Sequence, residues 1–282
     1  MAAMTHAFWK MHGLGNDFVV LDVRNRPLAI GEVQARALAD RRTGIGFDQL
    51  LLIERDENGA DAFLRIRNSD GSEVAACGNG SRAVARLLLE ETGKDRVVIG
   101  TAAGPIHASR AGPDAVSVDM GPARLDWREI PLARAMDTLR LDFAMGPLEA
   151  PVAVSMGNPH AVFFVPDAEA VDLETWGPKI ETDPLFPART NVEAVHLLGP
   201  DRLRMRVWER GTGITRACGT GACAAGVAAA RRGLTGREVD VVLDGGTLGI
   251  LWRADGHVVM TGPAALSYTG TLADDLAAVA GL

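Results

Sequence analysis

Two cysteines of this sequence have nearly identical neighbours: Cys77 begins Cys-Gly-Asn-Gly and Cys218 begins Cys-Gly-Thr-Gly. A helix that starts at such glycines places unpaired N–H groups and about half a positive charge beside the sulfur. This setting favours the thiolate and is expected to move the thiol pKa down from about 8.5 toward neutrality. The glycines also let the backbone turn tightly and expose its N–H groups to an anion.

One copy of this pattern is compatible with a redox cysteine, a nucleophile or a phosphate-binding loop. Two copies in similar domains would let two thiols face opposite sides of one carbon atom. A thiolate could then remove an α-proton while a thiol on the other face delivers a new one. Backbone N–H groups and helix ends in a water-excluded cleft would stabilise the charge that develops. The two cysteines therefore indicate an amino-acid racemase or epimerase.

The two cysteines belong to an internal repeat, because they lie 141 positions apart and their surroundings match without gaps. Upstream of each, Leu64–Asn68 aligns with Met205–Glu209 at the same offset. A second match at 142 positions pairs Leu14–Val20 with Met156–Val162, and Asn16 with Asn158. Two matches at nearly the same interval indicate two similar domains that arose by duplication.

Residue patterns predict strands at 63–67 and 203–208, each followed by a turn and by a helix that the Cys-Gly-x-Gly segment opens. The first helix should end at Gly93, and the second is expected over 222–232. Met-Gly-Pro near 119–122 marks the domain junction, and residues 264–282 are expected to return to the first domain. Further short strands are expected at 96–99, 116–118, 152–154, 239–243 and 258–260.

Composition excludes several other classes of protein. The net charge of −7, with dispersed charges, argues against nucleic acid as a partner. No apolar run approaches the roughly 20 residues of a transmembrane helix, and the N-terminus lacks a secretory signal, so we expect a cytoplasmic protein. Only Lys10, Lys94 and Lys179 could hold pyridoxal phosphate, and none lies in a motif. Three cysteines are too few for a disulfide scaffold, and without a Cys-x-x-Cys pair we expect no zinc site. The third cysteine, Cys223, is expected to be a buried residue that packs in the core.

With these features in place, the sequence resembles the diaminopimelate epimerase family over almost its whole length. Six fragments follow in the order of that family. They are His12–Phe18, Gly44–Gln49, the segment from Asn68 through Cys77 to Gly80, Gly157–His160, Asn191–Glu193, and Glu209–Gly211 leading through Cys218 to Gly221. Ile214, where the family commonly has a polar residue, is a small departure.

The resemblance implies an α+β fold of two domains related by pseudo-two-fold symmetry, each a mixed, barrel-like sheet around a central helix. The domains would be 1–121, completed by 264–282, and 122–263. It implies a cofactor-independent, metal-free isomerase that interconverts LL- and meso-2,6-diaminopimelate in lysine and cell-wall precursor biosynthesis, as a homodimer. The catalytic residues would be Cys77 and Cys218, supported by His160 and Glu209. The substrate-binding residues would be Asn16, Gln49, Asn68, Gly78, Asn79, Asn158, Asn191, Glu209, Arg210, Gly219 and Thr220.

Three alternatives remain open from the sequence. A proline or hydroxyproline racemase would share the two-cysteine chemistry, although Glu209 and Arg210 favour a substrate with a second amino-acid end. A thiol redox protein would pair Cys77 with Cys218 in a disulfide. A non-catalytic amino-acid-binding protein would not need the thiols. The sequence leaves undecided the oligomeric state, the resting ionisation of the two thiols and the extent of domain closure.

Overall fold

The computed structural model describes residues 6–75 and 77–272, and its contacts divide the chain into two compact units. The first unit runs up to Val118 and resumes at Gly262, and the second is Asp119–Thr261. These bounds lie within a few residues of those expected at 121 and 264. Residues 273–282, part of the segment expected to return to the first domain, lie outside the described residues.

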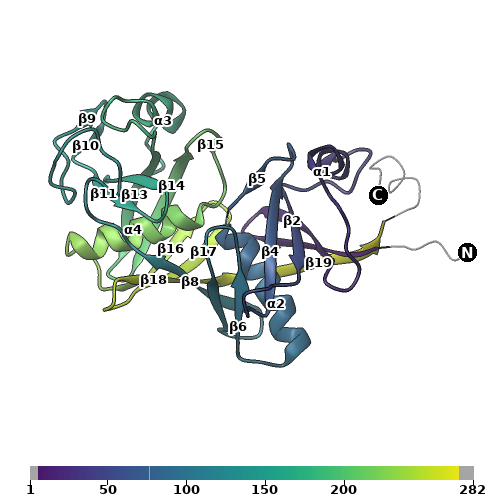
Figure 1. Ribbon diagram of the computed structural model, residues 1–282. Coiled ribbons are helices and arrows are strands. Elements are labelled where there is room, and N and C mark those ends of the chain that lie inside the picture. The colour runs from purple at the N-terminus through teal and green to yellow at the C-terminus, as the bar shows by residue number, and fades with distance from the viewer. Residues whose placement is uncertain (1–5, 76, 273–282) are drawn as a thin grey trace, which may run out of the picture. The chain divides into compact units, whose positions relative to one another are not determined.

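The first unit is built on a mixed sheet (Figure 1). β1 pairs with β2 antiparallel, β2 with β3 parallel, and β3 with β4 antiparallel. β4 then pairs with β5 antiparallel and with β6 parallel, and β6, β7 and β8 continue antiparallel. β19 lies antiparallel beside β1. The strands are β1 (Ala7–Gly13), β2 (Asn16–Asp22), β3 (Gln49–Glu54), β4 (Ala62–Asn68), β5 (Glu73–Val74), β6 (Arg96–Gly100), β7 (Ile106–Arg110), β8 (Ala115–Pro122) and β19 (Ala265–Thr271).

The second unit repeats this order of pairings strand for strand. β11–β12 is antiparallel, β12–β13 parallel, β13–β14 and β14–β15 antiparallel, β14–β16 parallel, and β16–β17 and β17–β18 antiparallel. A separate small hairpin joins β9 to β10. The strands are β9 (Ala144–Met145), β10 (Leu148–Glu149), β11 (Val152–Ser155), β12 (Pro159–Phe164), β13 (Asn191–Gly199), β14 (Arg202–Glu209), β15 (Gly213–Ile214), β16 (Glu238–Leu243), β17 (Gly246–Trp252) and β18 (His257–Pro263).

The repeat extends to the register of single residues. In the first unit Phe18 lies opposite Gln49 across the parallel pair β2–β3. In the second, His160 lies opposite Asn191 across β12–β13. Both partners are shifted by 142 positions, the interval found in the sequence, so a residue of one unit has a defined equivalent in the other.

Each unit has one central helix, which begins directly after its cysteine. These helices are α2 (Gly78–Thr92) and α4 (Gly219–Arg231), both labelled in Figure 1. α2 packs against β1, β2, β3, β6 and β7, and α4 against β11, β12, β13, β14, β16 and β17. α2 ends as predicted at Gly93, whose φ of 67° is left-handed and suits glycine. The expected start of α4 at residue 222 is wrong by three residues, because Cys218 caps the helix at Gly219.

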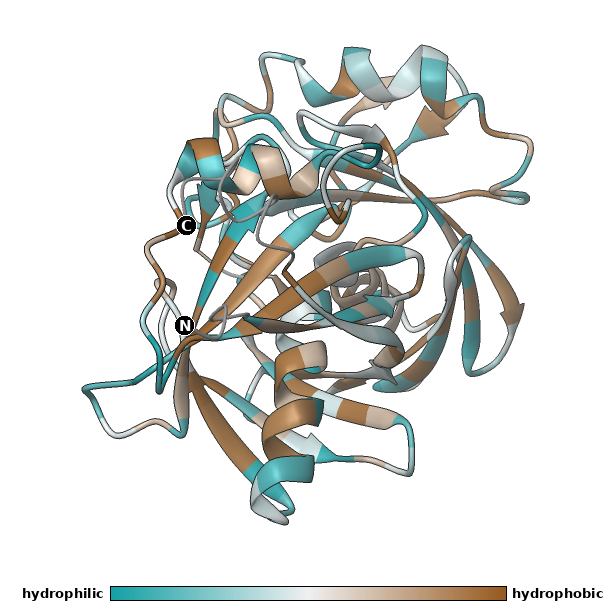
Figure 2. Ribbon diagram, turned by 90° about the vertical axis from the view of Figure 1, so that its right-hand side faces the viewer, coloured by the Kyte–Doolittle hydropathy of each residue, from teal (hydrophilic) through white to brown (hydrophobic). Residues whose placement is uncertain are grey.

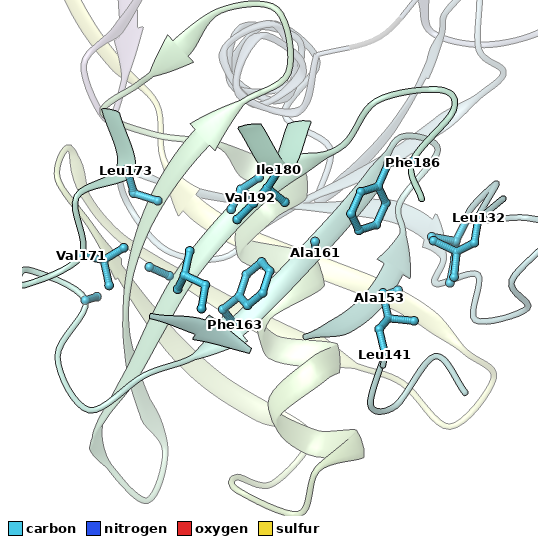
Figure 3. Packing of buried hydrophobic residues seen from close by; sticks show 14 residues of the cluster. Leu132, Leu141, Ala153, Ala161, Phe163, Val171, Leu173, Ile180, Phe186 and Val192 are labelled. Atoms are coloured by element: carbon cyan, nitrogen blue, oxygen red, sulfur yellow. The ribbon is translucent and has the colours of Figure 1, made fainter. Parts of the chain in front are cut away.

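A second helix in each unit covers the other side of the strands: α1 (Glu32–Ala39) and α3 (Leu173–Glu181). α3 contributes Ile180 to a core that also contains Leu141, Phe163 and Phe186 (Figure 3). Along single strands the ribbon changes repeatedly between brown and teal in Figure 2, which is the alternation expected of strands with one buried face. β14, for example, buries every second residue from Leu203 to Val207.

The architecture confirms the predicted α+β class, with mixed sheets and a repeated element order. Every short strand expected from Val-rich segments lies within an observed strand. Among the described residues, no helix is both long and apolar enough to cross a membrane.

Candidate active site

In the first unit, Cys77 caps the start of α2. Its backbone is extended (φ −148°), and its Sγ accepts a hydrogen bond from the Gly80 N–H at 3.5 Å. The Cys77 carbonyl accepts the N–H of Ser81 at 2.8 Å, which starts the helical pattern. A Cβ at Gly80 would lie 3.0 Å from Leu51 Cδ2, so a larger residue there would require the Leu51 side chain to shift. The sulfur therefore lies at the positive end of a helix, as the sequence predicts.

Two amides of the first unit are joined beside the ends of β3 and β4. Gln49 Nε2 donates to Asn68 Oδ1 at 3.1 Å, and Asn68 Nδ2 donates to the Ser72 hydroxyl at 3.1 Å. Gln49 Oε1 is buried and has no hydrogen-bond partner. A buried acceptor without a donor is costly, and a donor on a bound molecule would remove that cost.

Asn16 follows a tight turn in which Leu14 and Gly15 have positive φ angles of 56° and 88°. Its Nδ2 donates to Asp48 Oδ2 at 3.0 Å, which fixes the orientation of the amide. The neighbouring Asp17 is bound by Lys10, with Nζ 2.5 Å from Oδ2. Although burial opposes it, hydrogen bonds and ion pairs from Arg41 and Lys10 hold the pKa of Asp17 well below its usual value.

In the second unit, Cys218 occupies the equivalent position at the start of α4. Its Sγ accepts from the Gly221 N–H at 3.4 Å and lies 3.6 Å from Thr220 Oγ1. Burial raises the pKa of the Cys218 thiol well above its ordinary value, and the carboxylates of Glu209 and Glu193 raise it further. These effects outweigh the hydrogen bonds from Thr220 and Gly221. The expectation of a thiol shifted toward neutrality is therefore wrong for Cys218, because the helix start is buried beside carboxylates.

Glu209 lies at the end of β14 in contact with this thiol. Burial raises the pKa of the Glu209 carboxyl, opposed by the hydroxyl of Thr215, which donates to Oε1, and by His160 and Cys218. A carboxyl that is buried near a thiol can exchange a proton with it or stabilise one protonation state.

His160 and Asn158 lie on β12 and in the turn before it. His160 is fully buried, with Nδ1 2.6 Å from Glu193 Oε1 and Nε2 3.0 Å from Asn158 Oδ1. Asn158 Nδ2 donates to Thr220 Oγ1 at 3.3 Å. The structure thus links the predicted site residues His160, Asn158 and Thr220 to Cys218 in one continuous set of contacts.

Asn191 and Arg210 are joined by a different set of contacts. Asn191 is buried, its Nδ2 donates to the Pro159 carbonyl at 2.8 Å, and its Oδ1 accepts the Arg210 N–H at 2.9 Å. The exposed Arg210 side chain donates to the Ala188 carbonyl at 2.9 Å. Asn191 therefore joins the backbone at Pro159 to the backbone at Arg210, whereas the Arg210 guanidinium retains donors for a ligand.

The contacts join part of the predicted set within each unit. In the first unit Gln49 contacts Asn68, Asn16 contacts Asp48, and Cys77, Gly78 and Asn79 lie at the start of α2. In the second unit contacts link Asn158, His160, Glu209, Thr220 and Cys218, and join Asn191 to Arg210. Cys223 is fully buried in α4, as expected of a packing residue. The described part of the chain contains no group of three or more His, Cys, Asp or Glu side chains that could hold a metal ion.

Several supporting residues escaped the sequence interpretation. Glu193 is fully buried although it carries a carboxyl group. The feature of the sequence that could have indicated this is a single acidic residue among the apolar residues Val192, Ala194 and Val195. Arg82 is also fully buried, one turn into α2, and donates to Asn79 Oδ1 at 2.9 Å. Glu181 accepts from Trp208 Nε1 at 2.7 Å and from the Gly211 N–H at 2.9 Å, which fixes the loop after β14.

The fold is one that solved epimerases also have. A hydroxyproline epimerase from Agrobacterium vitis superposes with a TM-score of 0.66 over 96% of this chain and 91% of its own, at 17% identity. This likeness shows a shared fold and no more, and places the chain in the class of proteins with this repeated two-unit fold.

Sequence comparison identifies the family within that class. The model of the diaminopimelate epimerase family matches residues 8–125 and 152–267. The chain is 57% identical to a diaminopimelate epimerase of Rhodospirillum centenum over 274 residues, 97% of this chain and 94% of the relative. It is 58% identical to one of Erythrobacter litoralis over 269 residues, 95% of this chain and 97% of the relative. The chain belongs to the diaminopimelate epimerase family and is an enzyme of that family.

Proposed function

We propose that this enzyme interconverts LL- and meso-2,6-diaminopimelate by a two-base mechanism in which Cys77 and Cys218 exchange the α-proton. In each direction one thiolate removes the proton from the α-carbon and becomes a thiol. The other thiol donates its proton to the opposite face of the same carbon and becomes a thiolate. No net proton is gained or lost, so the reverse reaction starts from the state that the forward reaction leaves.

The observation that carries this proposal is the equivalence of the two helix starts. Both sulfurs accept the N–H three residues ahead, from Gly80 at 3.5 Å and from Gly221 at 3.4 Å. Beside each sulfur the next N–H groups of the helix, those of Gly78 and Asn79 or of Gly219 and Thr220, have no helical acceptor. They are available to the substrate carboxylate, where negative charge builds up as the proton leaves.

The ionisable neighbours of Cys218 support a mechanism in which one of the two thiols is protonated while the other is ionised. Because its pKa is raised, the Cys218 thiol stays protonated in the free enzyme and is ready to act as the acid. His160 and Glu209, which lie in the Cys218 half-site, would assist the proton exchange.

The distal amino-acid end of the substrate would be bound by the remaining polar side chains. The unpaired Gln49 Oε1 supplies an acceptor for an ammonium group, and the exposed Arg210 guanidinium supplies donors for a carboxylate. Asn16, Asn68, Asn158 and Asn191 complete the proposed substrate-binding set.

The remaining expectations concern the setting of the enzyme. We infer a homodimer in the cytoplasm that serves lysine and cell-wall precursor biosynthesis without cofactor or metal. The support is the family membership.

The proposal is tested by following the change of stereochemistry with LL-diaminopimelate and with L-proline as alternative substrates. We expect turnover of diaminopimelate alone in the wild type. Cys77→Ser and Cys218→Ser should each lower kcat by at least about 100-fold, because a hydroxyl is a far weaker acid than a thiol. Cys223→Ser is the matched control and should retain wild-type turnover. Turnover of proline alone, or full activity of either active-site variant, would contradict the proposal.

A further inference from the structure

A buried carboxylate and imidazole lie behind the Cys218 half-site, and neither side chain has any exposed area (0% and 0%). Glu193 Oε1 lies 2.6 Å from His160 Nδ1, and Asn158 Oδ1 lies 3.0 Å from His160 Nε2. A carboxylate oxygen and an amide carbonyl oxygen are both acceptors. With both oxygens accepting, this geometry is that of a ring that donates from both nitrogens, one to Glu193 and one to Asn158.

The contacts continue from His160 to the sulfur. Because the Asn158 carbonyl is occupied by His160, its Nδ2 is turned to Thr220 Oγ1 and donates to it at 3.3 Å. The Thr220 hydroxyl, having accepted that bond, lies 3.6 Å from Cys218 Sγ with its own proton free to be donated. A ring that donates from Nε2 holds the Asn158 carbonyl toward His160 and leaves the Asn158 Nδ2 facing Thr220.

Glu193 also lies directly behind the start of α4. A Cβ at Gly221 would be 3.0 Å from Glu193 Oε1 and 3.2 Å from Cys218 Sγ. The second carboxylate oxygen, Oε2, is buried with no hydrogen-bond partner. A buried charge with incomplete hydrogen bonding costs stability, so a purely structural role gives no reason for its presence.

The first unit shows that the fold does not require this pair. The register of β2–β3 and β12–β13 makes Phe18 the equivalent of His160 and Leu51 the equivalent of Glu193. Phe18 and Leu51 are fully buried, and Leu51 faces Gly80 as Glu193 faces Gly221. The same backbone therefore accepts an apolar pair in one unit and a charged pair in the other.

We propose that Glu193 is a positioning residue for Cys218, which acts by holding His160 doubly protonated and, through it, orienting Asn158 and Thr220 toward the sulfur. The proposal rests on the proposed function, in which Cys218 exchanges the substrate proton. It assigns Glu193 no contact with substrate.

A kinetic cycle tests whether Glu193 acts through His160. Glu193→Gln should lower kcat by about 10–100-fold with KM nearly unchanged, the size expected for a residue that orients a reacting group through another. In a His160→Phe background, Glu193→Leu should cause no further loss, because the residue it acts through is already gone. The double variant copies the pair present in the first unit, and a thermal melt establishes that it folds. Glu169→Gln, at an exposed carboxylate bound to Arg204, is the control and should behave as wild type.

A spectroscopic readout does not depend on turnover. In protein labelled with ¹⁵N-histidine, the His160 signals are identified by their loss in His160→Phe. We expect both ring nitrogens protonated at neutral pH in the wild type, and one deprotonated in Glu193→Gln.

The outcomes separate this inference from the proposed function. A wild type that leaves diaminopimelate unchanged would overturn the proposed function, while the ¹⁵N spectrum would still decide the state of His160. A neutral His160 in the wild type, an unchanged kcat in Glu193→Gln, or an independent loss from Glu193→Leu in the His160→Phe background would each overturn the role of Glu193.

Discussion

The two cysteines have equivalent places in the backbone but chemically different neighbours. Behind Cys77, the residue that faces Gly80 is the apolar Leu51. Behind Cys218, the equivalent residue is the carboxylate Glu193, and Glu209 is a second carboxylate in contact with the thiol. Negative charge and burial both disfavour a thiolate, so Cys218 keeps its proton in the free enzyme.

Removing one of these carboxylates tests that explanation. Glu209→Gln should lower the pKa of Cys218, because a neutral amide no longer repels the thiolate, whereas the wild-type carboxylate raises that pKa. The thiolate should therefore form at lower pH in the variant. The ultraviolet absorbance of the thiolate, followed against pH in a Cys77→Ser, Cys223→Ser background, measures the shift. An unchanged or higher pKa would show that the carboxylate does not control the thiol.

At the scale of the elements, each sulfur is positioned by how its helix begins. The N-cap cysteine accepts a hydrogen bond from the N–H three residues ahead. Because Gly221 has no side chain, α4 can begin directly against Glu193. The other end of a helix contributes only stability, as at Gly93, whose left-handed conformation ends α2.

A pair of glycine variants separates these two contributions. Gly93→Ala should lower the free energy of unfolding by about 1 kcal/mol, because alanine is strained at positive φ, and should leave kcat unchanged. Nothing lies within 4 Å of the Cβ it would add. Gly221→Ala should lower kcat by at least about 10-fold, because its Cβ would displace Glu193 or Cys218. Denaturant unfolding and steady-state kinetics measure both; an inactive Gly93→Ala or a fully active Gly221→Ala would refute the distinction.

The elements and the equivalent positions of Cys77 and Cys218 at two helix starts were predictable, because hydrophobic alternation, turn residues and a repeat are local or periodic signals. The burial of Glu193 and the raised pKa of Cys218 were not, since both depend on which side chains the sheet brings behind the helix. The sequence interpretation placed the start of α4 three residues too late, because the start depends on the cap that Cys218 forms. Glycine and threonine at 219–221 are poor helix formers, and the cap at Cys218 overrides their propensity.

Across the whole molecule, two units share the same order of strand pairings and have one central helix each. The residues behind the helix starts differ, with Phe18 and Leu51 in one unit and His160 and Glu193 in the other. Two-base catalysis needs two groups of one kind that hold different protonation states at a given moment. In the proposed exchange, the carboxylates behind Cys218 and the apolar Leu51 behind Cys77 would supply that difference.

The most direct test of two-base exchange is the first-turnover fate of deuterium when LL-diaminopimelate is converted in deuterated water. Because the thiol that delivers the new proton has exchanged with solvent, the meso product should contain one deuterium at the inverted carbon from the first turnover. The unreacted LL substrate should remain protiated at early times. A product that retains the original proton, or substrate that exchanges as fast as product forms, would show that one group serves both faces and would contradict the roles of Cys77 and Cys218.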